Sequence, residues 1–241
     1  MQTLILCGGE GTRAHPHTLE VPKPLLEVGG QPVLRHVMEI YASQGHAEFL
    51  LAAGFKLDLI NRFATELPSS WEVRVVDSGR DANTAERVWA CRDLVDDTFF
   101  LTYADGLADV DLAVLEHFHR SHPGSASVTV VPLPSPYGTV DIGVEGRVER
   151  FREKPSLLDH WVNGGFFLMD QDVFDHWSGA DLEREVLPAL AAVDQLFAYR
   201  HTGFWRSMDT YKDALELSAL CPGPGEARPP PWIRSPTPAS S

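Results

Sequence analysis

The chain has 241 residues, of which 44% are hydrophobic and 22% are charged, a globular composition with room for one large α/β domain or two small ones. Its formal net charge of −14 argues against non-specific binding to a nucleic-acid polymer or to an anionic membrane. A small phosphorylated ligand remains compatible with this charge, because a local basic pocket can lie inside an acidic protein.

Cysteine usage and the N-terminus indicate the compartment. Cys7, Cys91 and Cys221 are far apart and form no CxxC pair, which fits a reducing cytosol and excludes a disulfide framework or a cysteine zinc site. The N-terminus has no basic region, and its apolar stretch is too short for a signal peptide. No segment approaches the length of a membrane span. We therefore expect a cytoplasmic protein.

Strands and helices alternate through the first half of the chain. Short apolar runs predict buried strands, and helical spacing of apolar residues predicts the helices between them. Asn83 followed by Glu86 resembles a capping box at the start of one helix. The predicted order is strand 4–7, helix 32–43, strand 48–53, helix 57–64, strand 71–77, helix 83–95, strand 98–103, helix 111–121 and strand 126–132. This order predicts a doubly wound, Rossmann-like α/β fold with a mixed, mainly parallel sheet and ligands at the carboxyl ends of its strands.

The pattern changes after Pro132. Short β-like pieces at 138–143, 147–153 and 161–169 precede a helix at 181–193, which we expect to be bent or broken at Pro188. A strand at 196–201 and a helix from Thr210 follow. This half is predicted to be α+β material laid over one end of the sheet. Residues 221–241 are rich in Pro, Gly and Ser, so we expect disorder there, with at most Trp232 docking on the domain.

A glycine-rich loop follows the first predicted strand. It contains Gly8, Gly9 and Gly11, and glycine lets backbone N–H groups approach a phosphate closely. A Walker P-loop is excluded, because Arg13-Ala14 stand where that motif needs Gly-Lys.

The dinucleotide fingerprint is the second interpretation of this loop. Gly9, Gly11 and Ala14 match G-x-G-x-x-G/A, but that motif requires a helix directly after the loop. Prolines at positions 16, 22 and 24 prevent a long helix there. The fingerprint also leaves Arg13 and Lys23 unexplained, so a nicotinamide-dependent oxidoreductase is disfavoured.

A nucleoside triphosphate accounts for the whole loop. Glycine amides, the Thr12 hydroxyl, the Arg13 guanidinium and the Lys23 ammonium suit a polyphosphate. The two cations would neutralise the charge that builds on the β- and γ-phosphates as pyrophosphate departs. The alternative is a turn with incidental glycines and solvent-facing cations.

Ordered motifs along the chain resemble one family. The loop segment 6–13 and the segment Val21–Leu26 resemble the signature of the sugar-1-phosphate nucleotidyltransferases. Further segments resemble the glucose-1-phosphate cytidylyltransferase branch, namely 76–79, 102–109, 153–155, 163–167, 203–205 and 208–210. The resemblance extends to about Leu220. It implies a glycosyltransferase-A-like nucleotidyltransferase fold in a single domain, 1–220, with a nucleotide-binding part at about 1–132 and a sugar-binding part at about 133–220.

The resemblance also implies a reaction and a set of site residues. A sugar phosphate oxygen attacks the α-phosphorus of the nucleotide in line, pyrophosphate leaves, and Mg²⁺ is the cofactor. Arg13 and Lys23 are expected to act in catalysis, and Asp105 and Asp209 to bind the metal. For Asp209, a helix N-cap is the structural alternative. The residues expected at the nucleotide are Leu6, Gly8, Gly9, Gly11, Thr12, Arg13, Lys23, Thr84 and Arg87. Those expected at the sugar phosphate are Gly138, Glu153, Lys154, Asn163 and Gly165.

The substrates are expected to be CTP and a glucose-1-phosphate-like sugar phosphate, with no nucleic-acid polymer and no membrane as partner. Guanylyl- and thymidylyltransferases share the first loop, so another base stays open, as does another sugar, heptose or cyclitol 1-phosphate. A homo-oligomer also stays open. A non-catalytic NDP-sugar-binding subunit is the alternative of another class, and the presence of Arg13, Lys23, Asp105, Lys154 and Asp209 argues against it.

Overall fold

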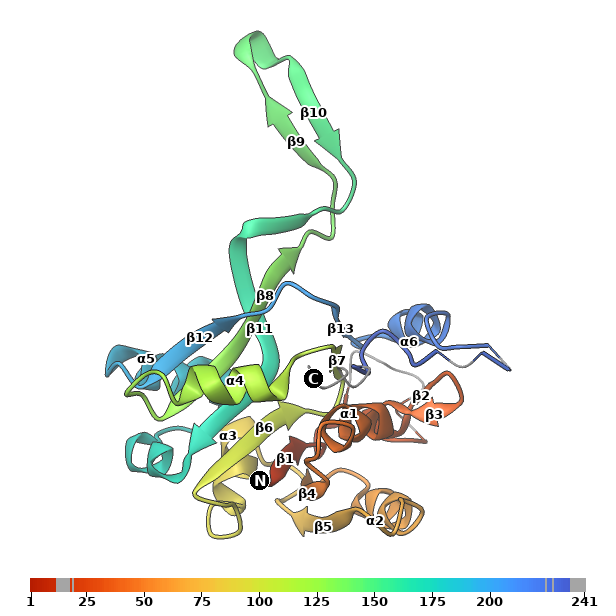
Figure 1. Ribbon diagram of the computed structural model, residues 1–241, viewed down its shortest axis with the longest axis vertical. Coiled ribbons are helices and arrows are strands. Elements are labelled where there is room, and N and C mark those ends of the chain that lie inside the picture. The colour runs from red at the N-terminus through yellow and green to blue at the C-terminus, as the bar shows by residue number, and fades with distance from the viewer. Residues whose placement is uncertain (12–17, 19, 224, 227, 235–241) are drawn as a thin grey trace, which may run out of the picture.

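Seven strands form one sheet at the centre of the molecule (Figure 1). The computed structural model describes all residues except 12–17, 19, 224, 227 and 235–241. The strand order is β12 (Leu196–Arg200), β8 (Ala126–Pro134), β11 (Ser156–Asp170), β6 (Thr98–Tyr103), β1 (Thr3–Leu6), β4 (Glu48–Ala53) and β5 (Glu72–Asp77). β11 runs antiparallel to both of its neighbours, and every other neighbouring pair in the sheet is parallel. The predicted mixed, mainly parallel sheet is confirmed.

Helices cover both faces of this sheet. Successive side chains of a strand point to opposite faces, so Ile5 belongs to one buried cluster and Leu4 to the other. The first cluster packs against α1 (Val33–Ala42), α2 (Leu57–Thr65), α4 (Leu112–His119) and α6 (Tyr211–Ser218). The second packs against α3 (Thr84–Ala90), the π-helical turn η6 (Leu182–Val186) and α5 (Leu187–Ala192). None of the described helices is both long and apolar enough to cross a membrane.

Local signals in the sequence fix several helix ends. The Asn83 N–H donates to Glu86 at 2.8 Å, which confirms the capping box of α3. This helix ends at Ala90, five residues earlier than the predicted Val95. The expected break near Pro188 is a change from η6 to α5, and Pro188 lies in the first turn of α5.

We predicted that the second half of the chain lies over one end of the sheet. Its strands instead extend the sheet itself. β11 pairs with β6 on one side and β8 on the other, and β12 pairs with β8. The continuous apolar stretch Phe166–Met169 is fully buried, as expected for a strand with neighbours on both sides. The short β-like segments after Pro132 do not by themselves predict which sheet each of them joins.

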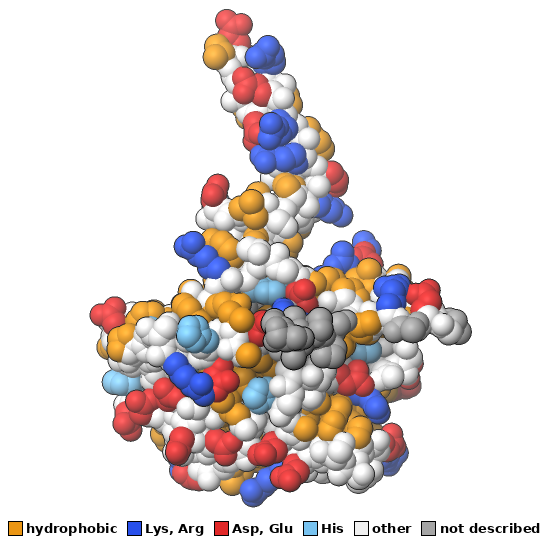
Figure 2. Space-filling model, in the orientation of Figure 1, with side chains coloured by type: hydrophobic (Ala, Val, Ile, Leu, Met, Phe, Trp, Pro, Cys, Tyr) orange, Lys and Arg blue, Asp and Glu red, His pale blue; other side chains and the backbone are white. Residues whose placement is uncertain are grey.

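One hairpin leaves this body. β9 (Thr139–Ile142) and β10 (Val148–Arg152) pair with each other and project from the ends of β8 and β11 (Figure 1). η4 (Val144–Gly146) forms its tip. Figure 2 shows hydrophobic side chains along the hairpin together with charges of both signs. Ile142 and Phe151 are among the exposed hydrophobic residues there.

Smaller pairs of strands complete the fold. β2 (Glu27–Val28) pairs with β3 (Gln31–Pro32), and β7 (Gly106–Ala108) pairs with β13 (Trp205–Ser207). The 3₁₀ turns η3 (Lys23–Leu25) and η5 (Gln171–His176) follow β1 and β11 along the chain. Trp232 docks on the domain, as the sequence analysis allowed, because its side chain is fully buried in the first cluster. A single tryptophan buries enough apolar surface to order the residues around it.

Candidate active site

A cavity of about 930 Å³ opens at the carboxyl ends of β1 and β6. This is where α/β sheets bind their ligands. The described segments that line it are 6–11, 80–84, 103–106 and 162–165, together with Lys23, Pro24, Arg87, Asp181, Glu183, Trp205, Ser207 and Asp209. Segments from both halves of the chain therefore meet in one cavity, at the position that the alternation of strands and helices predicted.

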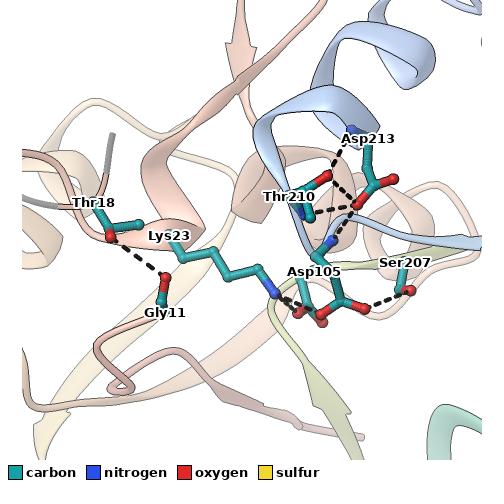
Figure 3. Close-up of polar contacts among 8 residues, drawn as sticks. Gly11, Thr18, Lys23, Asp105, Ser207, Thr210 and Asp213 are labelled. Carbon is teal, nitrogen blue, oxygen red and sulfur yellow. Dashed lines mark hydrogen bonds and ion pairs between the residues drawn. The ribbon is translucent and has the colours of Figure 1, made fainter. Parts of the chain in front are cut away.

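A lysine and two aspartates meet in this cavity (Figure 3). The Lys23 Nζ lies 2.5 Å from Asp105 Oδ2 and 3.3 Å from Asp209 Oδ1. Only 11% of the Lys23 side chain is exposed, so solvent screens these contacts weakly. Two carboxylates share one ammonium, which leaves the group with one net negative charge.

This donor set fits a hard divalent cation. Mg²⁺ is usually held by one or two protein carboxylates and keeps its remaining positions for water and phosphate oxygens. Asp105 and Asp209 supply two carboxylates whose oxygens converge on a single point, now taken by the Lys23 ammonium. Within the part of the chain that the structure describes, no group of three or more His, Cys, Asp or Glu forms a closed metal site. An open, two-carboxylate site is what a phosphate-bound cation needs.

The backbone fixes the position of both aspartates. Asp105 precedes β7, Asp209 follows β13, and the Met208 N–H donates to the Asp105 carbonyl at 2.9 Å. The Asp209 N–H donates to Asp213 Oδ2 at 3.0 Å (Figure 3). Thr210, rather than Asp209, is the N-cap of α6. The N-cap alternative for Asp209 is therefore wrong, and its carboxylate points at Lys23.

Two glycines of the loop, Gly8 and Gly11, are required by close contacts. A Cβ on Gly8 would lie 2.1 Å from Arg87 Nη1, and one on Gly11 would lie 2.5 Å from Lys23 Cβ. Gly11 also has a φ of +63°, which a residue with a side chain adopts at a cost. The loop thus presses against Arg87 on one side and Lys23 on the other. Gly8, Gly9, Gly11 and Leu6 line the cavity, whereas Thr12 and Arg13 lie outside the described residues.

Arg87 has a different environment from the one expected for a nucleotide contact. It lines the cavity but is only 4% exposed. Its Nη1 donates to Ser78 Oγ and to the Gly79 carbonyl, both at 2.8 Å, and its Nη2 donates to the Arg80 carbonyl at 3.1 Å. The guanidinium therefore holds the segment that leads into 80–84. A nucleotide role for Arg87 stays a prediction, and the contacts of the structure favour support of the cavity wall.

We expect Arg87→Met to destabilise the fold by about 2–4 kcal/mol, because it leaves several partly buried acceptors without a donor. Urea unfolding measures this effect. Arg62→Met, at an exposed position of α2, is the matched control and should change the free energy of unfolding by less than about 0.5 kcal/mol. An unchanged stability combined with weaker nucleotide binding would instead make Arg87 a ligand contact.

Residues from four elements form a bridge across the cavity, and sequence analysis named Thr84 and Asn163 of them but missed Tyr103 and Glu183. The Tyr103 hydroxyl donates to Glu183 Oε1, and Asn163 Nδ2 donates to the same hydroxyl at 3.2 Å. The Thr84 hydroxyl donates to Glu183 Oε2 at 2.9 Å. Burial, with the Glu183 charge next to it, raises the pKa of Tyr103, so this phenol stays protonated. Glu183 lies in the π-helical turn, and such turns are frequent at functional sites.

The residues predicted for the sugar phosphate fall into two groups. Asn163 and Gly165 line the cavity, and the Gly165 N–H donates to Asn163 Oδ1 at 2.8 Å. Gly138, Glu153 and Lys154, all in the described part of the chain, lie where the hairpin joins β8 and β11 (Figure 1) and do not line the cavity. Contact of these three with a sugar phosphate stays a prediction.

Comparisons with known proteins agree with this site. Residues 2–219 match the family described as "Nucleotidyl transferase". The chain is 36% identical over 245 residues to the "Probable glucose-1-phosphate cytidylyltransferase" of Bacillus subtilis, covering 91% of this chain and 96% of the relative. It is 36% identical over 227 residues to the "Probable mannose-1-phosphate guanylyltransferase 1" of Oryza sativa, covering 89% of this chain but 63% of that relative.

A solved structure supports the fold. HddC from Yersinia pseudotuberculosis superposes with a TM-score of 0.68 at 19% identity, covering 90% of this chain and 98% of the other. The family match over nearly the whole chain and the relatives at more than 30% identity confirm the resemblance that the motifs indicated. The chain therefore belongs to the nucleotidyl transferase family, and the protein is a transferase of that class.

Proposed function

We propose that this protein transfers a cytidylyl group from CTP to a glucose-1-phosphate-like sugar phosphate, giving an NDP-sugar and pyrophosphate with Mg²⁺ as cofactor. The observation that carries the proposal is the meeting of Lys23, Asp105 and Asp209 beside the glycine loop in one cavity. Phosphoryl chemistry of this kind depends on positioning and charge neutralisation, and these side chains supply both.

The choice of CTP rests on the relatives. The cytidylyltransferase of Bacillus subtilis matches along 96% of its own length, whereas the guanylyltransferase of Oryza sativa, at the same 36% identity, is matched along 63%. The aligned region therefore spans nearly all of the first relative and less than two thirds of the second. Guanylyl transfer is the second candidate for this reason.

The cavity residues would have different roles in the reaction. Asp105 and Asp209 would hold the divalent cation, which when bound neutralises phosphate charge and orients the leaving pyrophosphate. The Lys23 ammonium, on the rigid Pro22-Lys23-Pro24 turn, would contact the α-phosphate, where negative charge builds as the sugar phosphate oxygen attacks. Backbone N–H groups of the glycine loop would bind the remaining phosphate oxygens.

Pyrophosphate release tests the substrates. The purified chain is incubated with each common NTP against a panel of sugar 1-phosphates, with Mg²⁺ or with EDTA. We expect release with CTP and glucose 1-phosphate that EDTA abolishes. Release with GTP and another hexose phosphate would support guanylyl transfer instead, and no release with any pair would contradict an enzymatic role.

Tyr103→Phe should weaken the sugar end of the site. Loss of the hydroxyl removes the contacts with Asn163 and Glu183 and costs about 1 kcal/mol of binding, roughly fivefold in the KM for the sugar phosphate. We expect kcat to change by less than twofold. Steady-state kinetics with each substrate varied in turn separates this result from a higher KM for the nucleotide, which would place the bridge at the nucleotide instead.

A further inference from the structure

The two aspartates that we propose as metal ligands lie at one end of a short two-stranded ribbon, β7 and β13. The strands pair antiparallel, from Gly106 opposite Ser207 to Ala108 opposite Trp205. Asp105 and Asp209 flank the end at the cavity. The other end is closed by the Asp109 N–H, which donates to the Phe204 carbonyl at 3.2 Å. A ribbon of this length is marginally stable by itself, so its position depends on what holds the far end.

The segment 228–234 holds that far end. The Trp232 ring contacts the Phe204 ring with centroids 5.9 Å apart, and it meets His36 of α1 edge-on at 5.3 Å. The Trp232 side chain is fully buried. Arg234 Nη1 donates to the Asp109 carbonyl at 3.1 Å. The two residues that close the ribbon, Phe204 and Asp109, are therefore the two that this segment binds.

Arg234 also ties the ribbon to the helix that follows β7. Its Nη2 lies 3.0 Å from Asp111 Oδ2, and Asp111 is the N-cap of α4 through a bond from the Val114 N–H. The side chains of Arg234 and Asp111 are 36% and 29% exposed. The His201 ring lies 3.0 Å from Asp109 Oδ1. Asp109 is therefore held by His201 as well as by Arg234.

We propose that residues 228–234 form a strap that fixes the angle of the β7–β13 ribbon and so sets the position of Asp105 and Asp209 relative to Lys23 and the glycine loop. Trp232 and Arg234 are positioning residues for the reaction. The proposal rests on the proposed function, because the carboxylates matter for rate only if they hold the cation and its phosphates. The family match ends at residue 219, so the strap lies beyond the part of the chain that the match covers.

The strap should affect turnover more than nucleotide affinity. It contacts the ribbon, α1 and α4, whereas Gly8 and Gly11 of the glycine loop lie against Arg87 and Lys23. A misplacement of about 1 Å in a reacting group can reduce a rate about 100-fold. We therefore expect Trp232→Ala to lower kcat about 10- to 100-fold with a KM for the nucleotide within about twofold of the native value.

The experiment compares four variants with the native chain at a temperature below every Tm. Trp232→Ala removes the anchor, and Trp232→Phe keeps an aromatic ring and should restore most of kcat. Arg234→Gln breaks the contact with Asp109 without opening a cavity, so it should lower kcat about three- to tenfold with little change in Tm. Leu190→Ala, buried in the other cluster on α5, is the control for destabilisation and should lower Tm while leaving kcat within about twofold.

The outcomes separate the strap from the proposed function. If Trp232→Ala and Arg234→Gln keep the native kcat while Trp232→Ala lowers the Tm as much as Leu190→Ala does, the segment is only structural. The proposal of a strap would then be wrong. A KM effect without a kcat effect also contradicts it. If the native chain itself releases no pyrophosphate with any NTP, the proposed function fails before the strap is tested.

Discussion

Asp105→Asn and Asp209→Asn should each reduce pyrophosphate release by at least about 100-fold, the scale on which removing one preorganised electrostatic group acts. Each variant keeps the size of the side chain and removes one of the two charges that face Lys23. Asparagine is a poor ligand for Mg²⁺ compared with a carboxylate. Initial rates at saturating CTP and glucose 1-phosphate measure the effect.

The control for both variants is Asp58→Asn. Asp58 is exposed in the first turn of α2 and should keep native activity. Circular dichroism and thermal melting check that the active-site variants fold. Full activity in either Asp105→Asn or Asp209→Asn would contradict the assignment of that residue to the metal. Activity that more Mg²⁺ restores would support it.

Lys23→Met should have the second large effect, and we expect it to change both kcat and the response of Tm to Mg²⁺. We expect kcat to fall about 100- to 1000-fold, because the charge that would neutralise the α-phosphate is gone. We also expect Mg²⁺ alone to raise the Tm of this variant more than that of the native protein. The Lys23 ammonium lies within 3.3 Å of both carboxylates, so it competes with a cation, and without it two carboxylates repel each other.

Lys212→Met is the matched control. Lys212 is 77% exposed and 3.7 Å from Glu216 on α6, so its loss should change neither kcat nor the Mg²⁺ dependence of Tm. Thermal melting with and without Mg²⁺, in the absence of substrate, measures the competition separately from turnover. A Lys23→Met variant with a smaller Mg²⁺ shift than the native protein would show that the lysine assists cation binding instead of opposing it.

Local sequence patterns were sufficient to predict much of the secondary structure in the nucleotide-binding half. The strands at 48–53 and 98–103 and the capping box at Asn83 are as predicted, because apolar runs and caps depend on neighbouring residues. The motif order also brought Lys23, Asp105 and Asp209 into one site, although their side chains come from elements more than 80 residues apart.

The features that the sequence did not predict depend on contacts between segments that are far apart in the chain or on side-chain contacts that local patterns do not show. Whether 156–170 joins the main sheet is decided by its pairing with β6 and β8, which no local pattern reveals. The nucleotide role of Arg87 stays a prediction, and the sequence did not reveal that its guanidinium is bonded to protein acceptors. The composition of the C-terminal segment predicted disorder with at most Trp232 docked, and it could not predict the partners of that ring, which lie on α1 and before β13.

The central claim is nucleotidyl transfer at the α-phosphorus, and ³¹P NMR of the reaction with CTP, glucose 1-phosphate and Mg²⁺ tests it most directly. The account predicts that the sugar phosphate signal is replaced by two coupled signals of a new diphosphate ester, with one equivalent of pyrophosphate. Formation of CDP with inorganic phosphate would place attack at the γ-phosphorus and contradict the account. An unchanged spectrum with every common NTP and sugar 1-phosphate would contradict it as well.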